Sequence, residues 1–373
     1  MRKHLFAALS IGAAGALALS ACGGGSSDSS GSGGSGSDST TTAGKVGVIL
    51  PDAASSARYE SIDRPALKAA FEKAGVDYDI QNAGGDKNKF QSIAEGMLSS
   101  GVTVLLIDSL DDASGTAAIK KATDAGVPVI DYDRLTLGGG ASYYVSFDNV
   151  AVGTAMGTAL VKCMQDNGDK TGNVVELNGA PTDNNATLFK QGYDKVITDA
   201  GYTVTDSQAV PDWDNQKAGT LFEQIYTQQK GDFVGVAAAN DGLAGAVVAR
   251  LDTAGEAGKI PVTGQDATDE GLQRVLLGTQ CVTIFKDIKN QEAVSAADLA
   301  VALTKGDTAA ADALATGTTK DTKLNTDVKS VLLVPEAITA DKVMDVVSAG
   351  QTTAEKLCTT DELKKACEEY GVS

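Results

Sequence analysis

The sequence predicts an α/β fold with two Rossmann-like, doubly wound lobes, and three observations support this prediction. Short apolar runs alternate with amphipathic segments along the chain after residue 45. Amphipathic segments end at a glycine that is followed at once by a Val-rich run, as at Gly101 and Gly126. A glycine just past a helix takes the left-handed conformation easily, so this order favours helices that return directly to a sheet. The alternation then recurs after residue 143, which predicts a second lobe.

The first half supplies the elements of one parallel sheet. We expect strands at residues 45–50, 78–80, 102–107 and 127–130, with helices over 66–71, 90–98 and 117–125. The run 127–130 is apolar, and Asp131, Tyr132, Asp133 and Arg134 follow it directly. Ligands of open α/β sheets bind where the carboxyl ends of strands finish, so this strand end is a candidate site.

The second half repeats the pattern after a Gly-rich connector at 135–141. Strands are expected at 143–147, 174–177, 202–204, 234–238, 260–263 and 282–285, and helices at 150–164, 186–200, 216–229 and 242–254. Gly153, Ala155, Gly157 and Ala159 make one helix suited to close packing. The simplest architecture has two lobes joined near residues 135–143.

The amino terminus indicates export. Arg2, Lys3 and His4 precede an apolar segment at 5–19 that is too short for a spanning helix but suits a signal peptide. Leu19-Ser20-Ala21-Cys22 then resembles a bacterial lipobox, in which Cys22 is lipidated. The alternative is an ordinary signal with a chance cysteine. Residues 23–44 are almost entirely Gly, Ser, Thr and Asp, which predicts a flexible tether.

Composition excludes several classes of function. The chain has 31 basic and 49 acidic residues and no basic run, so a nucleic-acid partner is not expected. The only histidine is His4, inside the signal peptide. The mature chain therefore lacks His-based triads and His metal ligands. Residues 46–51 lack the glycine fingerprint of a dinucleotide site, and we expect neither a metal nor a cofactor.

Four cysteines follow Cys22, namely Cys163, Cys281, Cys358 and Cys367. None forms a CxxC pair, which disfavours a zinc site, and export favours disulfides. Four cysteines allow three connectivities, and the sequence does not choose among them. Cys358 and Cys367 are near enough in the chain to close a loop in the tail.

Polar side chains gather at the expected strand ends of both halves. The set combines Asp, Asn, Arg and Lys with aromatic residues, and it suits a sugar. Each sugar hydroxyl both donates and accepts, and the apolar face of the ring packs on an aromatic side chain. The groups at these strand ends are Asp52, Arg58, Tyr59, Asp108, Asp133, Arg134, Asn178, Asp183, Asn184, Asn185, Asp212, Trp213, Asp214, Asn240, Asp241, Gln265, Asp266 and Lys286.

Structural roles compete with this interpretation for each residue taken singly. Asp133 and Arg134 could form a surface ion pair, which would contribute little. Asp183 and Asn185 could cap the helix at 186, and Asp241 could cap the helix at 242. Trp213 could belong to the core. Capping alone does not explain why so many such groups fall on strand ends together.

The motifs Tyr132-Asp133-Arg134, Ser146-Phe147-Asp148-Asn149, Asp183-Asn184-Asn185-Ala186, Asn240-Asp241, Gly264-Gln265-Asp266-Ala267 and Phe285-Lys286 occur in one order. This series closely resembles the D-xylose-binding protein family, within the type I periplasmic sugar-binding proteins of ABC transporters. The resemblance spans residues 45–340. It implies two Rossmann-like lobes joined by a three-strand hinge that close on one pyranose.

The resemblance also implies roles for the candidate residues. It selects ten candidate residues from the strand ends. By position, Tyr59 and Trp213 correspond to the stacking aromatics, and the polar ligands correspond to Arg58, Asp133, Arg134, Asp183, Asn185, Asn240, Asp266 and Lys286. Tyr59 stands where the xylose binder has a larger aromatic, and residues 53–56 replace a bulkier, more polar loop. These departures leave xylose, glucose, galactose and arabinose open.

The implied crossings between lobes lie near 135–143, just after Asp266, and before Ser330. The division is a signal peptide at 1–21, a lipidated Cys and tether at 22–44, an N-terminal lobe of 45–135 plus 267–325, a C-terminal lobe of 136–266 plus 326–350, and a tail at 351–373.

These arguments predict a sugar-binding lipoprotein without catalytic activity. It would sit outside the cytoplasm, be held to the membrane by lipid alone, act as a monomer and deliver its ligand to an ABC permease. One alternative is a glycoside hydrolase with Asp133 and Asp266 as its two carboxylates, although nearby cations would keep both ionised. The other is a sugar-sensing receptor not coupled to transport. Asp131 is left out of the predicted site.

Overall fold

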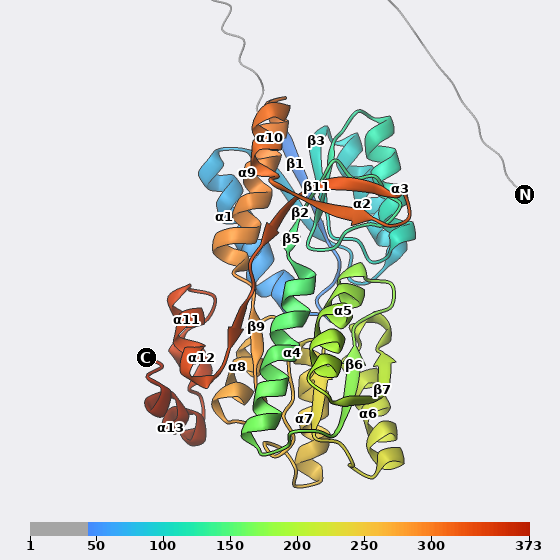
Figure 1. Cartoon of the computed structure of the whole chain (residues 1–373). Coiled ribbons are helices and arrows are strands. Elements are labelled where there is room, and N and C mark those ends of the chain that lie inside the picture. The colour runs from blue at the N-terminus through green and yellow to red at the C-terminus, as the bar shows by residue number, and fades with distance from the viewer. Residues whose placement is uncertain (1–43) are drawn as a thin grey trace, which may run out of the picture. The chain divides into compact units, whose positions relative to one another are not determined.

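The computed structural model describes residues 44–373 (Figure 1). The predicted signal peptide, Cys22 and the tether up to residue 43 lie outside the described residues. No helix within 44–373 is long and apolar enough to cross a membrane. The described chain is α/β, and its strands form two main sheets.

The larger sheet has seven strands in the order β10-β11-β5-β4-β3-β1-β2. All neighbours pair in parallel except β10 and β11, which are antiparallel. The strands are β1 Lys45–Leu50, β2 Asp77–Asn82, β3 Val102–Ile107, β4 Val129–Tyr132, β5 Tyr143–Phe147, β10 Gly317–Asp321 and β11 Thr326–Leu333. The parallel strands therefore bring their carboxyl ends to one edge.

Helices cover both faces of this sheet. Side chains alternate along a strand, so Val48 of β1 joins the core beneath α1 and α9, while Ile49 joins the core beneath α2 and α3. The covering helices are α1 Arg64–Ala74, α2 Lys87–Ser99, α3 Asp112–Asp124, α9 Ala293–Thr304 and α10 Thr308–Leu314. Because both faces are covered, the strands read as apolar runs.

The second sheet has the order β7-β6-β8, all parallel. Bridges from Val236 to Val262 and from Thr263 to Val282 extend it toward β9, which pairs antiparallel with β12. These strands are β6 Asn173–Asn178, β7 Thr203–Ala209, β8 Gly235–Ala238, β9 Thr283–Phe285 and β12 Glu336–Ile338. Its helices are α4 Asn149–Asp166, α5 Asn184–Asp199, α6 Asn215–Gln229, α7 Asp241–Thr253 and α8 Asp269–Leu276.

The predicted close packing of the helix at 150–164 occurs between α4 and α5. A Cβ added to Gly153 would lie 2.0 Å from the carbonyl oxygen of Phe189, and one added to Gly157 would lie 2.8 Å from Cα of Tyr193. Such distances leave no room for a side chain. The glycines of α4 therefore let two helix backbones meet over the second sheet.

The crossings between the two sheets differ from the predicted division. Strand β5 pairs with β4, and β11 pairs with β5 as far as Leu333, so residues 143–147 and 326–333 belong to the larger sheet. The first crossing therefore follows Phe147 and the third follows Leu333. Helix α8 packs on α7, and Thr263 bridges Val282, so the second crossing comes only after Phe285. The prediction failed because apolar strands of the two sheets look alike in sequence.

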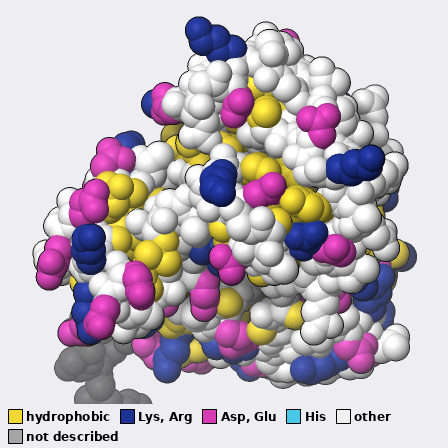
Figure 2. Space-filling model, turned by 90° about the horizontal axis from the view of Figure 1, so that it is seen from below, with side chains coloured by type: hydrophobic (Ala, Val, Ile, Leu, Met, Phe, Trp, Pro, Cys, Tyr) yellow, Lys and Arg dark blue, Asp and Glu magenta, His cyan; other side chains and the backbone are white. Residues whose placement is uncertain are grey.

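The carboxyl-terminal tail, taken from here on as all residues after β12 (339–373), packs beside α8 (Figure 1). Together with α8 and β9 it forms a small core that includes Leu272, Phe285, Val343 and Leu363. Its helices are α11 Val343–Ser348, α12 Ala354–Leu357 and α13 Asp361–Tyr370. Figure 2 shows a face on which acidic and basic side chains are interspersed with small groups of hydrophobic ones. Such mixing is ordinary for a protein surface.

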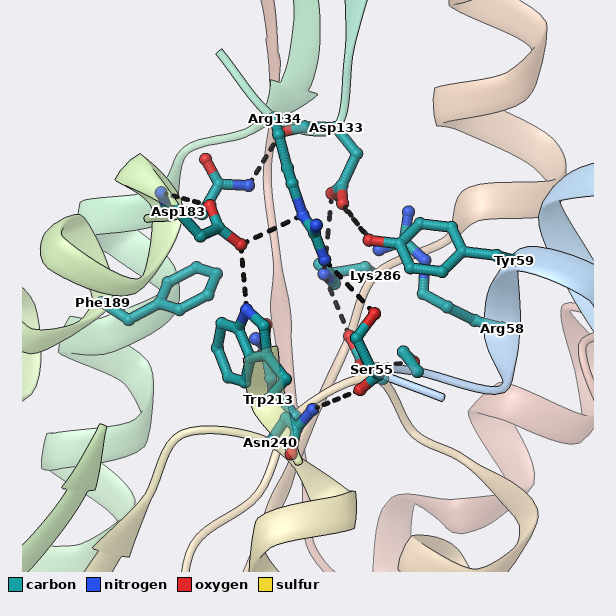
Figure 3. A pocket seen from close by; sticks show the side chains of 14 residues that line it. Ser55, Arg58, Tyr59, Asp133, Arg134, Asp183, Phe189, Trp213, Asn240 and Lys286 are labelled. Carbon is teal, nitrogen blue, oxygen red and sulfur yellow. Dashed lines mark hydrogen bonds and ion pairs between the residues drawn. The ribbon is translucent and has the colours of Figure 1, made fainter. Parts of the chain in front are cut away.

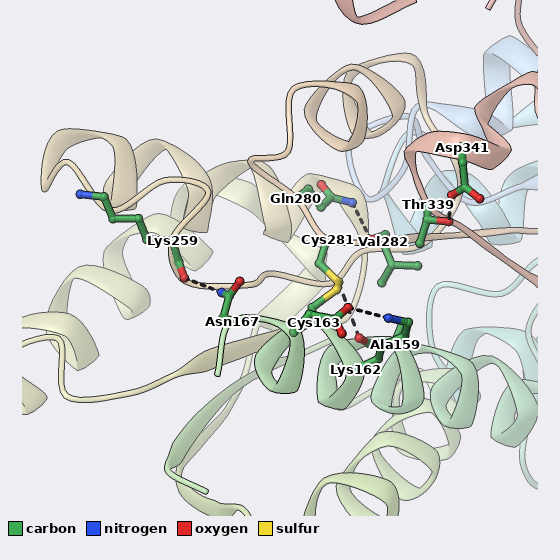
Figure 4. The surroundings of a disulfide bond; sticks show 11 residues. Ala159, Lys162, Cys163, Asn167, Lys259, Gln280, Cys281, Val282, Thr339 and Asp341 are labelled. Atoms are coloured by element: carbon green, nitrogen blue, oxygen red, sulfur yellow. Dashed lines mark hydrogen bonds and ion pairs between the residues drawn. A yellow bond between two sulfur atoms is a disulfide. The ribbon is translucent and has the colours of Figure 1, made fainter. Parts of the chain in front are cut away.

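Two disulfides tie these elements together. Cys358 bonds Cys367 inside the tail, which confirms the predicted loop closure. Cys163 of α4 bonds Cys281, just before β9, and joins segments 118 residues apart (Figure 4). The sequence had left this pairing open.

Candidate ligand-binding site

A cavity of about 300 Å³ lies where strand ends of the two sheets face each other (Figure 3). All ten candidate residues from the sequence line it, and their role in binding stays a prediction. Four further residues complete the lining: Ser55, Ser56, Phe189 and Gln265.

Arg58 anchors the wall contributed by the larger sheet. Its Nε and Nη2 donate to Asp63 at 3.0 and 2.9 Å, its Nη2 to Glu292 at 3.3 Å, and its Nη1 to Asp133 at 3.3 Å. Burial alone would lower the pKa of Arg58, but Asp133, Asp63 and Glu292 outweigh it and raise this pKa well above the ordinary value. Arg58 is therefore a permanent buried cation, and four of its five N–H donors are engaged by these carboxylates.

Two π-helical turns, η1 Tyr59–Asp63 and η3 Ile288–Glu292, carry the carboxylates that hold Arg58. The turns contact each other, and the Tyr132 hydroxyl also donates to Asp63 at 2.7 Å. Burial raises the pKa of Glu292 well above its ordinary value, against the effect of Arg58, and Asp133 and Asp63 add to the rise. Single π-turns are frequent at functional sites. Here they bring two carboxylates behind the cavity wall.

Asp133 occupies a left-handed backbone conformation with φ of 60°. Its carbonyl oxygen accepts from Tyr144 and Ser146, both at 2.9 Å, and from Asn185 at 2.8 Å. These three donors hold a conformation that a non-glycine residue rarely adopts. The carboxylate accepts from the Tyr59 hydroxyl at 2.9 Å.

The pKa of the Asp133 carboxyl is lowered from its ordinary value. Burial acts in the opposite direction, but Arg58, Lys286 and Arg134 together with the Tyr59 hydrogen bond prevail. Asp133 is thus ionised and unsuited to act as a general acid.

Arg134 extends into the cavity between Asp183 and Tyr59 (Figure 3). Its Nε lies 3.1 Å from Asp183 and 3.5 Å from Asp108, and its guanidinium carbon lies 5.6 Å from the Tyr59 ring centroid. Asp108 is fully buried behind Arg134, and neither of its carboxylate oxygens accepts a hydrogen bond from residues 44–373. Asp108 follows β3 and does not line the cavity, and burial raises the pKa of its carboxyl well above the ordinary value, against the effect of Arg134.

The second sheet supplies an aromatic wall. The Trp213 Nε1 donates to Asp183 at 3.1 Å, and Phe189 meets the indole edge-on with centroids 6.5 Å apart. Gly179 backs the indole, because a Cβ there would lie 2.1 Å from its ring. Trp213 is 5% exposed, as expected of a core residue, and it also lines the cavity, as expected of a candidate ligand-binding residue.

One side chain, that of Asp183, both caps a helix and lines the cavity. Asp183 caps α5 through the Asn185 N–H at 2.9 Å, and it faces Arg134 as well. The predicted cap of α7 by Asp241 is wrong, since Asn240 accepts from the Leu243 N–H at 2.9 Å. Asp241 is buried and instead accepts from Thr268, Gln280 and Thr283.

Asp266 and Lys286 form the floor between the sheets. The Lys286 Nζ lies 3.0 Å from the Asp266 carboxylate, which also accepts from Ser56 at 3.0 Å. Asp266 has φ of 95°, and its carbonyl accepts from Gln351 of the tail at 3.2 Å. A residue from the tail therefore supports the backbone of a cavity residue.

The missed lining residues had weak signals in the sequence. Phe189 lies four residues after Asn185 and so on the same face of α5, which helical spacing could have indicated. Gln265 lies between two residues already noted. Ser55 and Ser56 are small, and a loop sequence alone does not tell where they point.

The charges of the lining nearly balance. Asp133, Asp183 and Asp266 face Arg58, Arg134 and Lys286. The lining offers several hydrogen-bond donors and acceptors while its acidic and basic side chains are equal in number, which suits a neutral polar molecule. No group of His, Cys, Asp and Glu within 44–373 is arranged to hold a metal ion.

Comparisons with known proteins agree with this geometry. A family model described as "Periplasmic binding protein domain" matches residues 46–308. The D-xylose-binding periplasmic protein of Escherichia coli is 33% identical over 307 residues, covering 81% of this chain and 89% of that protein. The multiple sugar-binding periplasmic receptor ChvE of Rhizobium radiobacter is 31% identical, covering 71% and 79%.

Solved structures extend the likeness. An ABC transporter solute-binding protein of Clostridium phytofermentans with bound β-D-glucose superposes with a TM-score of 0.75 at 28% identity, covering 84% of this chain and 99% of that one. A Chloroflexus aurantiacus solute-binding protein in complex with D-glucose gives 0.75 at 29% identity, covering 83% and 97%. The chain therefore belongs to the periplasmic binding protein family, and within it to the type I sugar-binding proteins.

Proposed function

We propose that this protein captures a neutral monosaccharide in the cavity and delivers it to an ABC importer. The observation that supports this most is the composition of the lining, in which three acids, three cations and three aromatic side chains from both sheets converge. The relatives with xylose and glucose in their names or structures support the same ligand class.

The lining matches the chemistry of a pyranose. Carboxylates such as Asp266 accept hydrogen bonds from hydroxyls, while Arg134, Lys286 and Asn240 donate hydrogen bonds to the hydroxyl oxygens. Trp213 and Tyr59 offer apolar surfaces to the C–H faces of the ring. Within each side of the cavity the side chains already contact one another, as Arg58 does with Asp133 and Trp213 with Asp183, so each half of the site is preorganised and less entropy is lost on binding.

Contacts between the two sheets support closure around the ligand. Ser56 donates to Asp266, Asn240 donates to the carbonyl of Ser55 at 3.2 Å, and Arg134 meets Asp183. We assign the two sheets to two lobes that separate when the cavity is empty and close on the sugar about the three crossings. The sugar drives closure by its extra affinity for the closed state.

The experiment is a thermal-shift screen of the mature protein against xylose, glucose, galactose and arabinose, followed by calorimetry of the hits. A ligand that binds only the folded state raises the melting temperature. We expect at least one of these aldoses to bind with one site per chain. If none binds, while charged sugar derivatives do, the proposed ligand class is wrong.

Anchoring through Cys22 and monomeric action complete the proposal. The lipobox-like sequence before Cys22 and the Gly/Ser-rich segment after it support an extracytoplasmic protein tethered by lipid. A Cys22→Ala chain is expected in the medium or soluble extracytoplasmic fraction, and the unchanged chain in the membrane fraction. Equal partition of the two would contradict the anchor without affecting sugar binding.

A further inference from the structure

A second concave surface lies away from the cavity, along the outer side of α1. The space in this α1 groove and in the open solvent just above it is about 940 Å³. It is lined by Ser61, Ile62, Pro65, Ala66, Ala69, Ala70, Lys73, Lys289, Asn290, Val294, Gly350, Gln351 and Lys356. We propose that the α1 groove is a docking site for an acidic amphipathic segment of a partner protein.

The first support is an apolar strip of helical spacing. Ile62, Pro65 and Ala69 recur every three or four residues on one face of η1 and α1, and Pro65 and Ala69 are exposed. Val294 of α9 adds an exposed side chain at 39%. A strip of this spacing normally packs against another element. Within residues 44–373 these side chains line the groove, on the side of α1 that borders η3 and α9.

The second support is charge. Lys73, Lys289 and Lys356 line the groove, all three are exposed, and none forms an ion pair with a carboxylate of residues 44–373. Many other exposed lysines of this acidic chain are paired, as Lys120 is with Asp124 and Lys329 with Asp312. No acidic residue is among the groove lining. A partner that places carboxylates around an apolar ridge would satisfy both features.

The concave shape and the side-chain composition of the α1 groove favour one kind of occupant, an apolar helix face, over two others. An apolar helix face fits between α1 and the tail, where Lys289 donates to the Gly350 carbonyl at 3.0 Å and Asn290 donates to the Ala349 carbonyl at 2.9 Å. The chain's own Gly/Ser-rich segment at 23–44 lacks the apolar side chains to fill the floor. A flat anionic membrane would meet the rim of a concavity rather than its apolar floor.

The test uses the mature protein and a displayed library of amphipathic helical peptides. Apolar residues stand three and four positions apart, and the flanking positions are Glu, Gln or Lys. The groove variant is Lys73→Glu/Lys289→Glu/Lys356→Glu. The matched control is Lys89→Glu/Lys170→Glu/Lys305→Glu, which changes the same charge at exposed lysines that also lack ion pairs within the described chain.

We expect Glu-flanked peptides to be enriched on the unchanged protein and on the control, and to bind the groove variant at least tenfold more weakly. Val294→Asp should weaken the same peptides. The proposal is overturned if no Glu-flanked peptide is enriched, if Lys-flanked peptides are enriched equally, or if the groove variant binds as well as the control. Binding of phosphatidylglycerol vesicles, or self-association, that only the groove variant loses would assign the groove to lipid or to a second copy instead.

Discussion

The guanidinium of Arg58 meets the carboxylate of Asp63 through two parallel contacts, at 3.0 Å from Nε and 2.9 Å from Nη2. Both side chains are essentially buried, at 1% and 0% exposure. A two-point contact fixes the plane of the guanidinium, which leaves Nη1 directed at Asp133. The position of a cavity carboxylate therefore depends on a carboxylate that does not line the cavity.

Asp63→Asn is expected to destabilise the protein by about 3–5 kcal/mol, because it breaks a buried ion pair and turns amide hydrogens toward a cation. Urea unfolding followed by circular dichroism measures the change. The comparison is Asp124→Asn, which removes an exposed pair with Lys120 and should alter stability by less than about 0.5 kcal/mol. Similar losses in both variants would contradict the anchoring role of Asp63.

Asp266→Ala is expected to weaken sugar binding at least tenfold with little change in fold. A buried charge-assisted hydrogen bond contributes about 1.5–3 kcal/mol, and Lys286 would also lose its partner. Isothermal calorimetry gives the affinity. The exposed Asp77→Ala serves as the control. Unchanged affinity in Asp266→Ala would remove this residue from the site.

Gln351→Ala should weaken sugar binding although Gln351 does not line the cavity. Its amide donates to the carbonyl of Asp266, which holds an uncommon backbone conformation. Gln273 offers a matched test, since its amide donates to the carbonyls of Lys356 and Leu357 but not to Asp266. We expect a several-fold loss of affinity in Gln351→Ala and none in Gln273→Ala. Equal effects would mean that the tail acts only through general stability.

Asp131 should make stability depend on pH. Burial, opposed by hydrogen bonds from Thr136, raises its pKa to about 7. Between the unfolded pKa near 4 and this value, the folded chain binds the extra proton, so the free energy of unfolding falls as pH rises. Asp131→Asn removes this decrease in the free energy of unfolding, because an amide does not titrate, and the Asn side chain still offers one hydrogen-bond donor and one acceptor to Thr136.

Denaturant unfolding from pH 4 to 8 tests this prediction. The stability difference between Asp131→Asn and the unchanged protein should grow in favour of the variant, to about 4 kcal/mol at most at pH 8. The exposed Asp77→Asn controls for the lost charge. Parallel curves for the Asp131 variant and the unchanged protein would show that Asp131 does not titrate in this range.

The two disulfides should differ in their contributions. The chain-entropy model gives about 5 kcal/mol for the loop of 118 residues closed by Cys163 and Cys281, and about 3 kcal/mol for the 9-residue loop closed by Cys358 and Cys367. Guanidinium unfolding of the two double-Ala variants compares them. A larger loss on removing the tail disulfide would indicate that native-state packing, rather than loop length, dominates.

The parallel character of the larger sheet followed from local patterns, and the predicted lining followed from the strand ends together with the family resemblance. Glycine-terminated helices and apolar strands indicated a parallel sheet, and the ends of such strands meet because all of them point the same way. The ten candidates therefore converge on one cavity although they are spread from residue 58 to residue 286.

The lobe boundaries and the residues that support the cavity from behind depend on tertiary contacts that a single sequence does not show. Residues 143–147 are apolar and suit either sheet, and only pairing with β4 decides their place. Gln351 lies in a polar stretch of the tail, far in sequence from the residue it supports. Asp63 and Glu292 read as ordinary surface acids of helices, because the π-turns that bury them have no clear sequence pattern.

The wide spacing of the cavity residues has a consequence for biosynthesis. Lys286 completes the floor, and Glu292, 234 positions after Arg58, completes its cluster of carboxylates. A nascent chain that ends before these residues lacks the cation of the floor and one of the carboxylates that hold Arg58, however well its first strands have formed. Binding of the proposed sugar therefore requires that synthesis has passed these residues and that the distant segments have assembled, so an assay of sugar binding measures how much of the protein has matured.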